Sequence, residues 1–101
     1  MNNNATEAYE YYKELYAPFI IFFHINNTYQ AFFEDAEIIS TTLKIPTVEG
    51  RVTIPSQNIL DLVGELSTFG KQAKMISYRD DSGRYCLPDV AILKADKEAD
   101  I

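Results

Sequence analysis

The sequence predicts a small α/β domain in which a mixed β-sheet is packed with about three helices. A continuous apolar run at residues 19–25, FIIFFHI, is typical of a strand buried on both faces. Apolar residues at three- and four-residue spacing predict amphipathic helices over residues 29–43 and 56–69. Near the carboxyl end, two strand-like segments flank RDDSG, whose polar and glycine residues predict a hairpin turn.

Length and composition indicate one folded domain over residues 1–101. Its hydrophobic content of 47% and charged content of 24% are those of ordinary globular proteins. No apolar stretch reaches the roughly 18 residues that span a bilayer, and the amino terminus lacks the pattern of a signal peptide. We therefore expect a soluble cytoplasmic protein with no membrane contact, a structural thiol at Cys86, and frayed tails at residues 1–5 and 94–101.

The first predicted helix covers residues 7–16, with Thr6 as N-cap, and ends before Ala17 and Pro18 because proline disfavours helical geometry in the preceding residue. Tyrosines recur on one face of it, at positions 9, 12 and 16. Helical spacing of this kind favours a core face over an aromatic binding stripe. The apolar strand at residues 19–25 follows, and its His24, the only histidine, is expected at the edge of the core rather than in a metal or catalytic site.

The second helix is predicted from Tyr29, with Phe32, Phe33, Ala36, Ile39 and Leu43 on its apolar face. Asn27 would be its N-cap, and Gln30 could complete a capping box by bonding back to the cap amide. The alternative is that these polar residues form a binding surface, and the sequence favours neither. The two are compatible, because a helix start offers free amides and the positive end of the helix dipole to a phosphate.

The rest of the chain predicts further elements of the same domain. Pro46 and Gly50 mark a loop before a short strand, RVTIP. The third helix would begin near Ser56 and stop at Gly70, which suits the left-handed C′ position. Residues 73–78 and 84–93 are predicted to form the final strand pair.

The sequence has no signature of catalysis or cofactor binding: it contains no nucleophile elbow, phosphate-binding glycine loop, paired-cysteine motif or metal-spaced histidine cluster. We expect no enzyme activity, no cofactor and no metal. Glu34, Asp35 and Glu37 could be imagined as a magnesium site, but Glu34 and Glu37 are expected one helical turn apart on a solvated face, with no partner acid evident. Asp80 and Asp81 favour a turn over a site, since aspartate stabilises turns.

At FIIFFHINNTYQAFFEDAEII the chain resembles the amino-terminal, mismatch-recognition domain of the MutS family of DNA repair proteins. In that family a strand of the type L-F-F-R-M precedes G-D-F-Y-E-L-F and an acidic pair with alanine. Here IFFHI, NNTYQAF and FEDA follow in the same order. YYKELYAPF resembles the first helix of the family, and IPSQNILDLVGELSTFG the later V-P-x-H helix, so that residues 9–78 are covered.

The resemblance implies binding to duplex DNA at a distorted site, where a phenylalanine wedges beside the mismatched base and a glutamate hydrogen-bonds it. Thr28 stands at the wedge position and Gln30 at the glutamate position, which predicts DNA contact that is weak or not specific for mismatches. The candidate nucleic-acid contacts are Asn26, Asn27, Thr28, Tyr29, Gln30, Arg51, Lys71 and Lys74.

Two hypotheses follow for a stand-alone module of this kind. The first is weak duplex DNA contact, aided by a protein partner that supplies further DNA grip or the ATPase of full-length MutS proteins. The formal net charge of −6 opposes strong unaided binding, because a nucleic-acid binder normally has a basic face. The alternative is a protein–protein interaction module on the same fold that has lost DNA binding and meets a basic partner through its acidic face.

Overall fold

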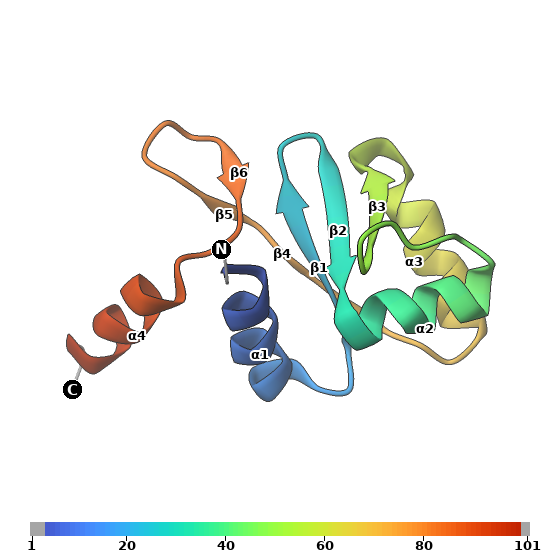
Figure 1. The fold of residues 1–101 in the computed structure, drawn as a ribbon, viewed down its shortest axis with the longest axis horizontal. Helices are drawn as coiled ribbons and strands as arrows, with labels where there is room; N and C mark the ends of the chain where they lie inside the picture. Colours follow the sequence, from blue (N-terminus) through green and yellow to red (C-terminus); the bar gives the residue numbers. More distant parts are fainter. Residues whose placement is uncertain (1–3, 100–101) are drawn as a thin grey trace.

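A computed structural model describes residues 4–99, in which three helices and four strands precede a carboxyl-terminal hairpin and helix (Figure 1). The apolar stretches form the strands and the amphipathic stretches form the helices that cover them. In chain order the elements are α1 (Asn4–Tyr16), β1 (Ile20–Ile25), β2 (Thr28–Phe32), α2 (Phe33–Leu43), β3 (Arg51–Pro55), the 3-10 turn η1 (Ser56–Asn58), α3 (Ile59–Thr68), β4 (Ala73–Ile76), β5 (Tyr78–Arg79), β6 (Tyr85–Cys86) and α4 (Val90–Ala99).

The main sheet has four strands in the order β3-β2-β1-β4. β2 runs antiparallel to both β1 and β3, whereas β4 runs parallel to β1, so the sheet is mixed as predicted. β5 and β6 pair as a separate two-stranded hairpin, which confirms the predicted turn at residues 79–83. β1 is central and its first four residues are buried, as expected for its unbroken apolar sequence.

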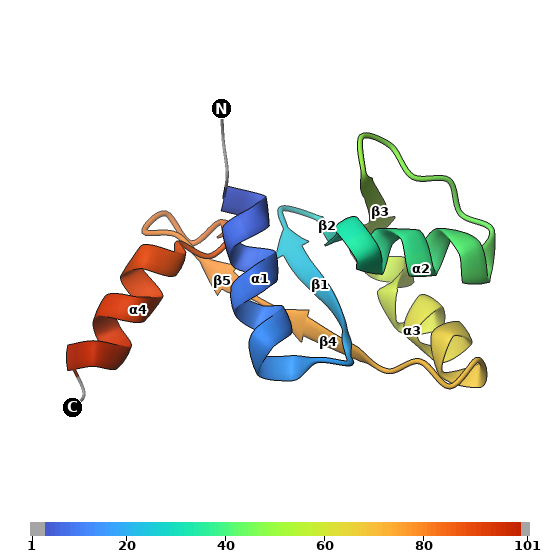
Figure 2. The ribbon, with the colours of Figure 1, turned by 60° about the horizontal axis from the view of Figure 1, so that its bottom comes forward.

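The two faces of the sheet carry separate clusters of buried side chains. On one face Ile20 and Phe22 of β1 pack with α2 and α3. On the other face Ile21 and Phe23 pack with Ala8 and Tyr9 of α1 and with residues near α4. The strands accordingly lie between α1 and the α2–α3 pair (Figure 2), and Tyr9 on the inner face of α1 confirms the prediction of a core face there.

The predicted helix start at Asn27 is wrong. Asn26 and Asn27 form the turn of a β-hairpin, in which Ile25 pairs with Thr28, and Tyr29 lies in β2. α2 begins only at Phe33, after Phe32, whose side chain makes no capping hydrogen bond. The capping box and the phosphate-attracting helix start at residues 27–30 are therefore excluded.

α3 follows the prediction closely. Ser56 opens a 3-10 turn that leads into the helix, and Gly70 adopts a φ of 76°, the left-handed conformation predicted for the C′ residue. The amide of Lys71 donates to the carbonyl oxygen of Leu66, closing the end of the helix.

Near both ends of the chain the observed helices differ from the prediction. α1 begins at Asn4, so Thr6 lies inside the helix rather than at its cap. Residues 90–99 form α4, not a strand and a frayed tail, and of the expected tails residues 1–3 and 100–101 lie outside the described range. Within residues 4–99, none of the helices has the length and apolar character that crossing a membrane requires.

Candidate nucleic-acid interface

One half of one sheet face is left uncovered by helices. α1 packs over β1 and β4, whereas β2 and β3 present four polar side chains and a proline on the same side of the sheet. By register these are Thr28, Gln30, Arg51, Thr53 and Pro55, which we call the open face. Thr53 and Pro55 are exposed and the other three are half-buried. The strand period of two brings Thr28 and Gln30 to the same side, so two of the predicted contacts lie together.

A chain of hydrogen bonds orders the open face. The side-chain amide of Gln30 donates from Nε2 to Thr28 Oγ1 at 3.2 Å, and its Oε1 accepts from Arg51 Nη1 at 3.1 Å. Arg51 also lies over the ring of Phe32, with its Cζ 5.3 Å from the centroid. Its Nε is buried and finds no hydrogen-bond partner among residues 4–99. The face therefore holds a fixed guanidinium beside an amide, two groups suited to phosphates and base edges.

The hairpin turn borders the open face at the far end of β1. Asn26 and Asn27 are both exposed, and Asn26 has a φ of 53°, a conformation that asparagine tolerates better than most residues. The amide of Asn26 donates to the carbonyl oxygen of Tyr85, and the carbonyl oxygen of Asn27 accepts from the amide of Ser56. The turn is thus tied to both neighbouring segments, while the two side chains remain available at the surface.

Tyr29 lies on the opposite face from Thr28 and Gln30. Its ring stacks on His24 at 4.4 Å, and His24 stacks on Tyr85 at 3.7 Å. Burial lowers the pKa of His24, with the nearby Arg79 acting in the same direction and a hydrogen bond that the imidazole donates to the Asn26 backbone opposing it. Tyr29 and His24 therefore join the sheet to the β5–β6 hairpin, and Tyr29 does not share the open face.

Two of the predicted basic contacts lie elsewhere. Lys74 pairs with Ile21 near the start of β1, whereas the hairpin turn follows the end of that strand. Its ammonium group lies 4.9 Å from the ring centre of Tyr16. Lys71 follows α3 and lines a shallow hollow with residues of α2. The predicted nucleic-acid contacts therefore do not form one surface. Of the three predicted basic residues, Arg51 lies on the open face and Lys71 and Lys74 do not.

The family model of MutS domain I matches residues 4–64. This chain belongs to the MutS domain I family. The match spans α1, the β1–β2 hairpin, the open face and most of α3, and the small α/β fold with a mixed sheet is that of the family. A search of curated proteins found no significant match.

MutS domain I is a DNA-recognition domain rather than a catalytic one, and membership of this family indicates a link to mismatch repair.

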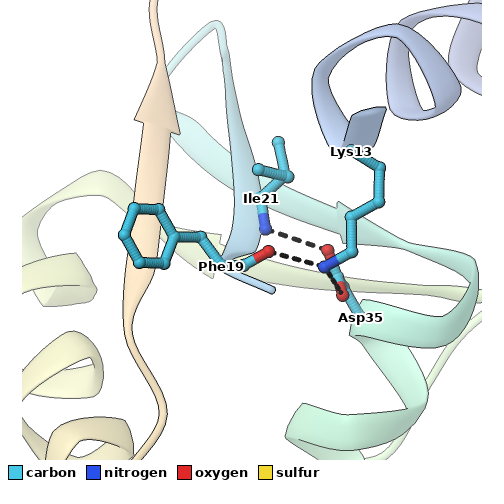
Figure 3. Close-up of polar contacts among 4 residues, drawn as sticks. All are labelled: Lys13, Phe19, Ile21 and Asp35. Atoms are coloured by element: carbon cyan, nitrogen blue, oxygen red, sulfur yellow. Dashed lines mark hydrogen bonds and ion pairs between the residues drawn. The ribbon is translucent and has the colours of Figure 1, made fainter. Parts of the chain in front are cut away.

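This domain also contains a buried ion pair that joins α1 to the rest of the fold (Figure 3). Asp35 on α2 is fully buried; its Oδ1 lies 2.9 Å from Lys13 Nζ, and its Oδ2 accepts from the amide of Ile21 at 2.9 Å. Lys13 Nζ also donates to the carbonyl oxygen of Phe19.

Both oxygens of the Asp35 carboxylate therefore bond to groups of the fold itself, Lys13 Nζ and the Ile21 amide. Glu34 and Glu37, beside it in sequence, are exposed on α2 as predicted. Among residues 4–99, no group of three or more histidine, cysteine or acidic side chains is placed to hold a metal ion.

Asp80 acts as a turn residue, because its Oδ1 accepts from the amides of Ser82 and Arg84. Its hydrogen bond from the Ser82 hydroxyl is the main reason its pKa is lowered.

Sequence reasoning missed Arg79 and Tyr85 as neighbours of the candidate interface. The guanidinium of Arg79 lies 4.5 Å from the ring centre of Tyr85, and Tyr85 contacts the hairpin turn through its backbone. The two residues lie on β5 and β6, more than 50 residues from Asn26 in the sequence. Only the fold brings them together, because nothing in the local pattern fixes where a terminal hairpin docks.

Proposed function

We propose that this MutS domain I contacts duplex DNA weakly, through the open face and the Asn26–Asn27 turn. The observation that carries the proposal is the chain of hydrogen bonds from Arg51 through Gln30 to Thr28 on an uncovered half of the sheet. Arg51 would bind a phosphate, and Gln30 would reach a base edge or sugar, since its amide can both donate and accept. Membership of a DNA-recognition family supports this assignment.

In this proposal Thr28 and Gln30 stand where the family has its wedge phenylalanine and its glutamate. Thr28 is short and its hydroxyl already donates to the carbonyl oxygen of Ile25 at 2.8 Å, so it cannot stack on a base. Gln30 is uncharged and lacks the negative charge of a glutamate. Contact through these two positions would accordingly be weak and tolerant of sequence.

The proposal is tested by titrating isotope-labelled protein with a short duplex at low salt, matched in one sample and mismatched in another, and following backbone amide shifts. We expect shifts at residues 26–30 and at Arg51 in both samples. Lys71 and Lys74 serve as internal controls and should not move, since they lie away from the open face. Flat titrations at high protein concentration would remove the proposal.

The double variant Thr28→Phe with Gln30→Glu sharpens the test. If the open face docks on DNA, the new ring can stack beside a mismatched base, and the variant should prefer the mismatched duplex. An unchanged ratio of the two affinities would show that these positions do not face the base pairs.

A second candidate function is an interaction module for a basic protein. A groove of about 370 Å³ lies between α1 and α4, and Tyr11, Val90 and Ala91 are among the residues that line it. Three acidic residues of α1 line it, Glu7, Glu10 and Glu14, against one lysine, Lys94. A partner captured from native lysate that survives nuclease treatment, and that Glu10→Lys with Glu14→Lys abolishes, would favour this function.

A further inference from the structure

The outward side of α3 carries apolar side chains that the fold does not bury. The inward side of the helix packs into the core through Ile59, Leu62 and Leu66. Leu60, by contrast, is 72% exposed, and Phe69, which directly follows the helix, is 59% exposed. Single exposed apolar residues are common on protein surfaces, so these two gain meaning from the surface that lies between them.

Two shallow hollows adjoin on this side of the domain. The first has a volume of about 710 Å³ and is lined by Leu60, Gly64, Thr68 and Phe69. The second, of about 300 Å³, lies where α3 meets the loop after α2 and the end of β3, and is lined by Ile45, Ile54, Pro55 and Leu62. Asp61 and Glu65 line both hollows and therefore stand between them. We call the two hollows with these two acids the α3 surface.

Gly64 lies near the middle of α3, in the first hollow. Glycine is among the least favourable residues in a helix interior, because it loses the most backbone freedom on folding. A Cβ added at this position would meet no atom within 4 Å, so packing within the domain does not require a glycine. A residue without a side chain does let the backbone of another molecule approach closely. Gly64 therefore marks a point at which a partner helix can cross α3.

The α3 surface is acidic. Asp61 and Glu65 are exposed and one helical turn apart, and neither hollow is lined by a lysine or an arginine. A second copy of the domain in a symmetric pair would set these carboxylates against their equivalents, and DNA would set phosphates against them, so both are repelled. The complementary occupant is a protein segment that combines apolar side chains with lysine or arginine. An amphipathic helix meets this requirement, because its residues four apart share one face and match the spacing of the two acids.

We propose that the α3 surface docks an amphipathic helix of a protein partner. The apolar side chains of that helix fill the two hollows, its backbone crosses α3 at Gly64, and its lysines or arginines face Asp61 and Glu65.

This docking site is independent of the proposed DNA contact. α3 packs on the face of the sheet opposite the open face, and of the open-face residues Pro55 alone lines either hollow. The hydrogen-bonded chain on the open face therefore stays uncovered when the helix is bound. The α3 surface is also separate from the groove between α1 and α4, with which it shares no lining residue.

The test titrates isotope-labelled protein with a synthetic amphipathic peptide of about 16 residues, which carries leucines on one face, an alanine at its centre and lysines beside them. We expect shifts of the backbone amides over residues 54–69 that saturate below about 1 mM peptide. The same peptide with glutamates in place of the lysines should bind about tenfold more weakly. Unmoved amides in this segment at that concentration, or equal binding of the two peptides, would overturn the proposal.

Gly64→Gln separates the crossing point from stability. Glutamine is a good helix former, so the urea midpoint should rise, whereas its side chain obstructs the approach and should weaken binding of the lysine peptide about tenfold. Ser67→Gln is the matched control, because Ser67 is exposed on the same helix and lines neither hollow. It should bind the peptide as the wild type does. If Gly64→Gln also binds as tightly as the wild type, no helix crosses there and the proposal fails.

The charges are tested by Asp61→Asn with Glu65→Gln, which should weaken binding of the lysine peptide about tenfold and make it less dependent on salt. Glu10→Gln with Glu14→Gln removes the same number of charges from the groove between α1 and α4, and should change neither quantity. Shifts confined to residues 7–14, or a loss of binding in the second pair of variants instead of the first, would place the peptide in that groove and overturn the docking site on α3. The proposed DNA contact would stand or fall separately, because no DNA is present in these titrations.

Discussion

Tyr9 illustrates how a core position predicted from helical spacing can still contain a polar group with an unusual environment. Its side chain is 8% exposed, and its hydroxyl has no hydrogen-bond partner in the described part of the chain. Burial, together with the negative charges of Asp35 and Glu34, raises the pKa of Tyr9 to about 12. Helical spacing identified the buried face, but it carried no information on the two carboxylates that α2 brings near the ring.

This pKa predicts a loss of stability at alkaline pH. Between the ordinary tyrosine pKa of about 10 and the raised value, the unfolded chain has lost a proton that the folded chain keeps, so the free energy of unfolding falls as pH rises. We expect Tyr9→Phe to reduce this fall by on the order of 1–2 kcal/mol between pH 9 and pH 11, measured by urea denaturation at several pH values. At neutral pH the variant should change stability by less than about 1 kcal/mol, because the hydroxyl is unpartnered.

The control for this prediction is Tyr29→Phe, which removes a hydroxyl from a ring that stacks on His24 rather than packing beside carboxylates. It should retain the alkaline loss seen in the wild type. Parallel pH profiles for the wild type and Tyr9→Phe would show that Tyr9 does not titrate differently in the folded and unfolded states.

At the scale of elements, the one wrong assignment near the candidate interface has a clear cause. Tyr29, Phe32 and Phe33 have the three-and-four spacing of a helix, and they run directly into the true helical pattern of Ala36 and Ile39. β2 nevertheless pairs with strands on both sides, and these hydrogen bonds override a pattern that only three residues support. Apolar periodicity alone could not locate the boundary between strand and helix.

α4 was predictable from a signal that the apolar run obscured. Asp89 follows Pro88, and its Oδ1 accepts from the amides of Ala91 and Ile92, as an N-cap does. The residues after it are mostly good helix formers. Residues 87–93 are apolar enough to resemble a strand, and Asp89, the cap within this stretch, is the signal that indicates a helix instead.

The ion pair between Lys13 and Asp35 links α1 to α2, and through the amide of Ile21 it also holds β1. We expect Asp35→Asn to lower the free energy of unfolding by about 2–3 kcal/mol, because Lys13 loses its anionic partner. The loss should be smaller than for a fully buried pair, since the Lys13 side chain is 23% exposed. Urea denaturation at neutral pH measures it.

Glu37→Gln is the matched control, because Glu37 is an exposed acid on the same helix. It should change stability by less than about 0.5 kcal/mol. If the two variants were equally stable, the interaction between Lys13 and Asp35 would contribute nothing to the joining of α1. In the sequence Asp35 stands among acidic neighbours, and the residues alone do not show that Lys13, 22 positions earlier, reaches it.

At the scale of the whole molecule, charge decides how firmly the domain can hold DNA. The formal net charge is −6, and the acidic groove between α1 and α4 concentrates part of it. Lys71 and Lys74 lie away from the open face, so they do not add to a positive surface there. The second half of the chain contains seven lysines and arginines. The fold leaves Arg51 on the open face, with Arg79 close to the turn.

This distribution predicts a shallow dependence of DNA binding on salt. Each phosphate neutralised contributes a slope of about −0.9 to the logarithm of the association constant against the logarithm of salt concentration. With Arg51 and at most Arg79 in reach, the slope should lie between about −1 and −2, measured by fluorescence anisotropy with a labelled duplex. Arg51→Gln should make it shallower by about 1, whereas Lys71→Gln should leave it unchanged. If Arg51→Gln does not alter the slope, Arg51 does not contact a phosphate. A much steeper slope for the wild type would mean that DNA lies across a different and more basic part of the surface.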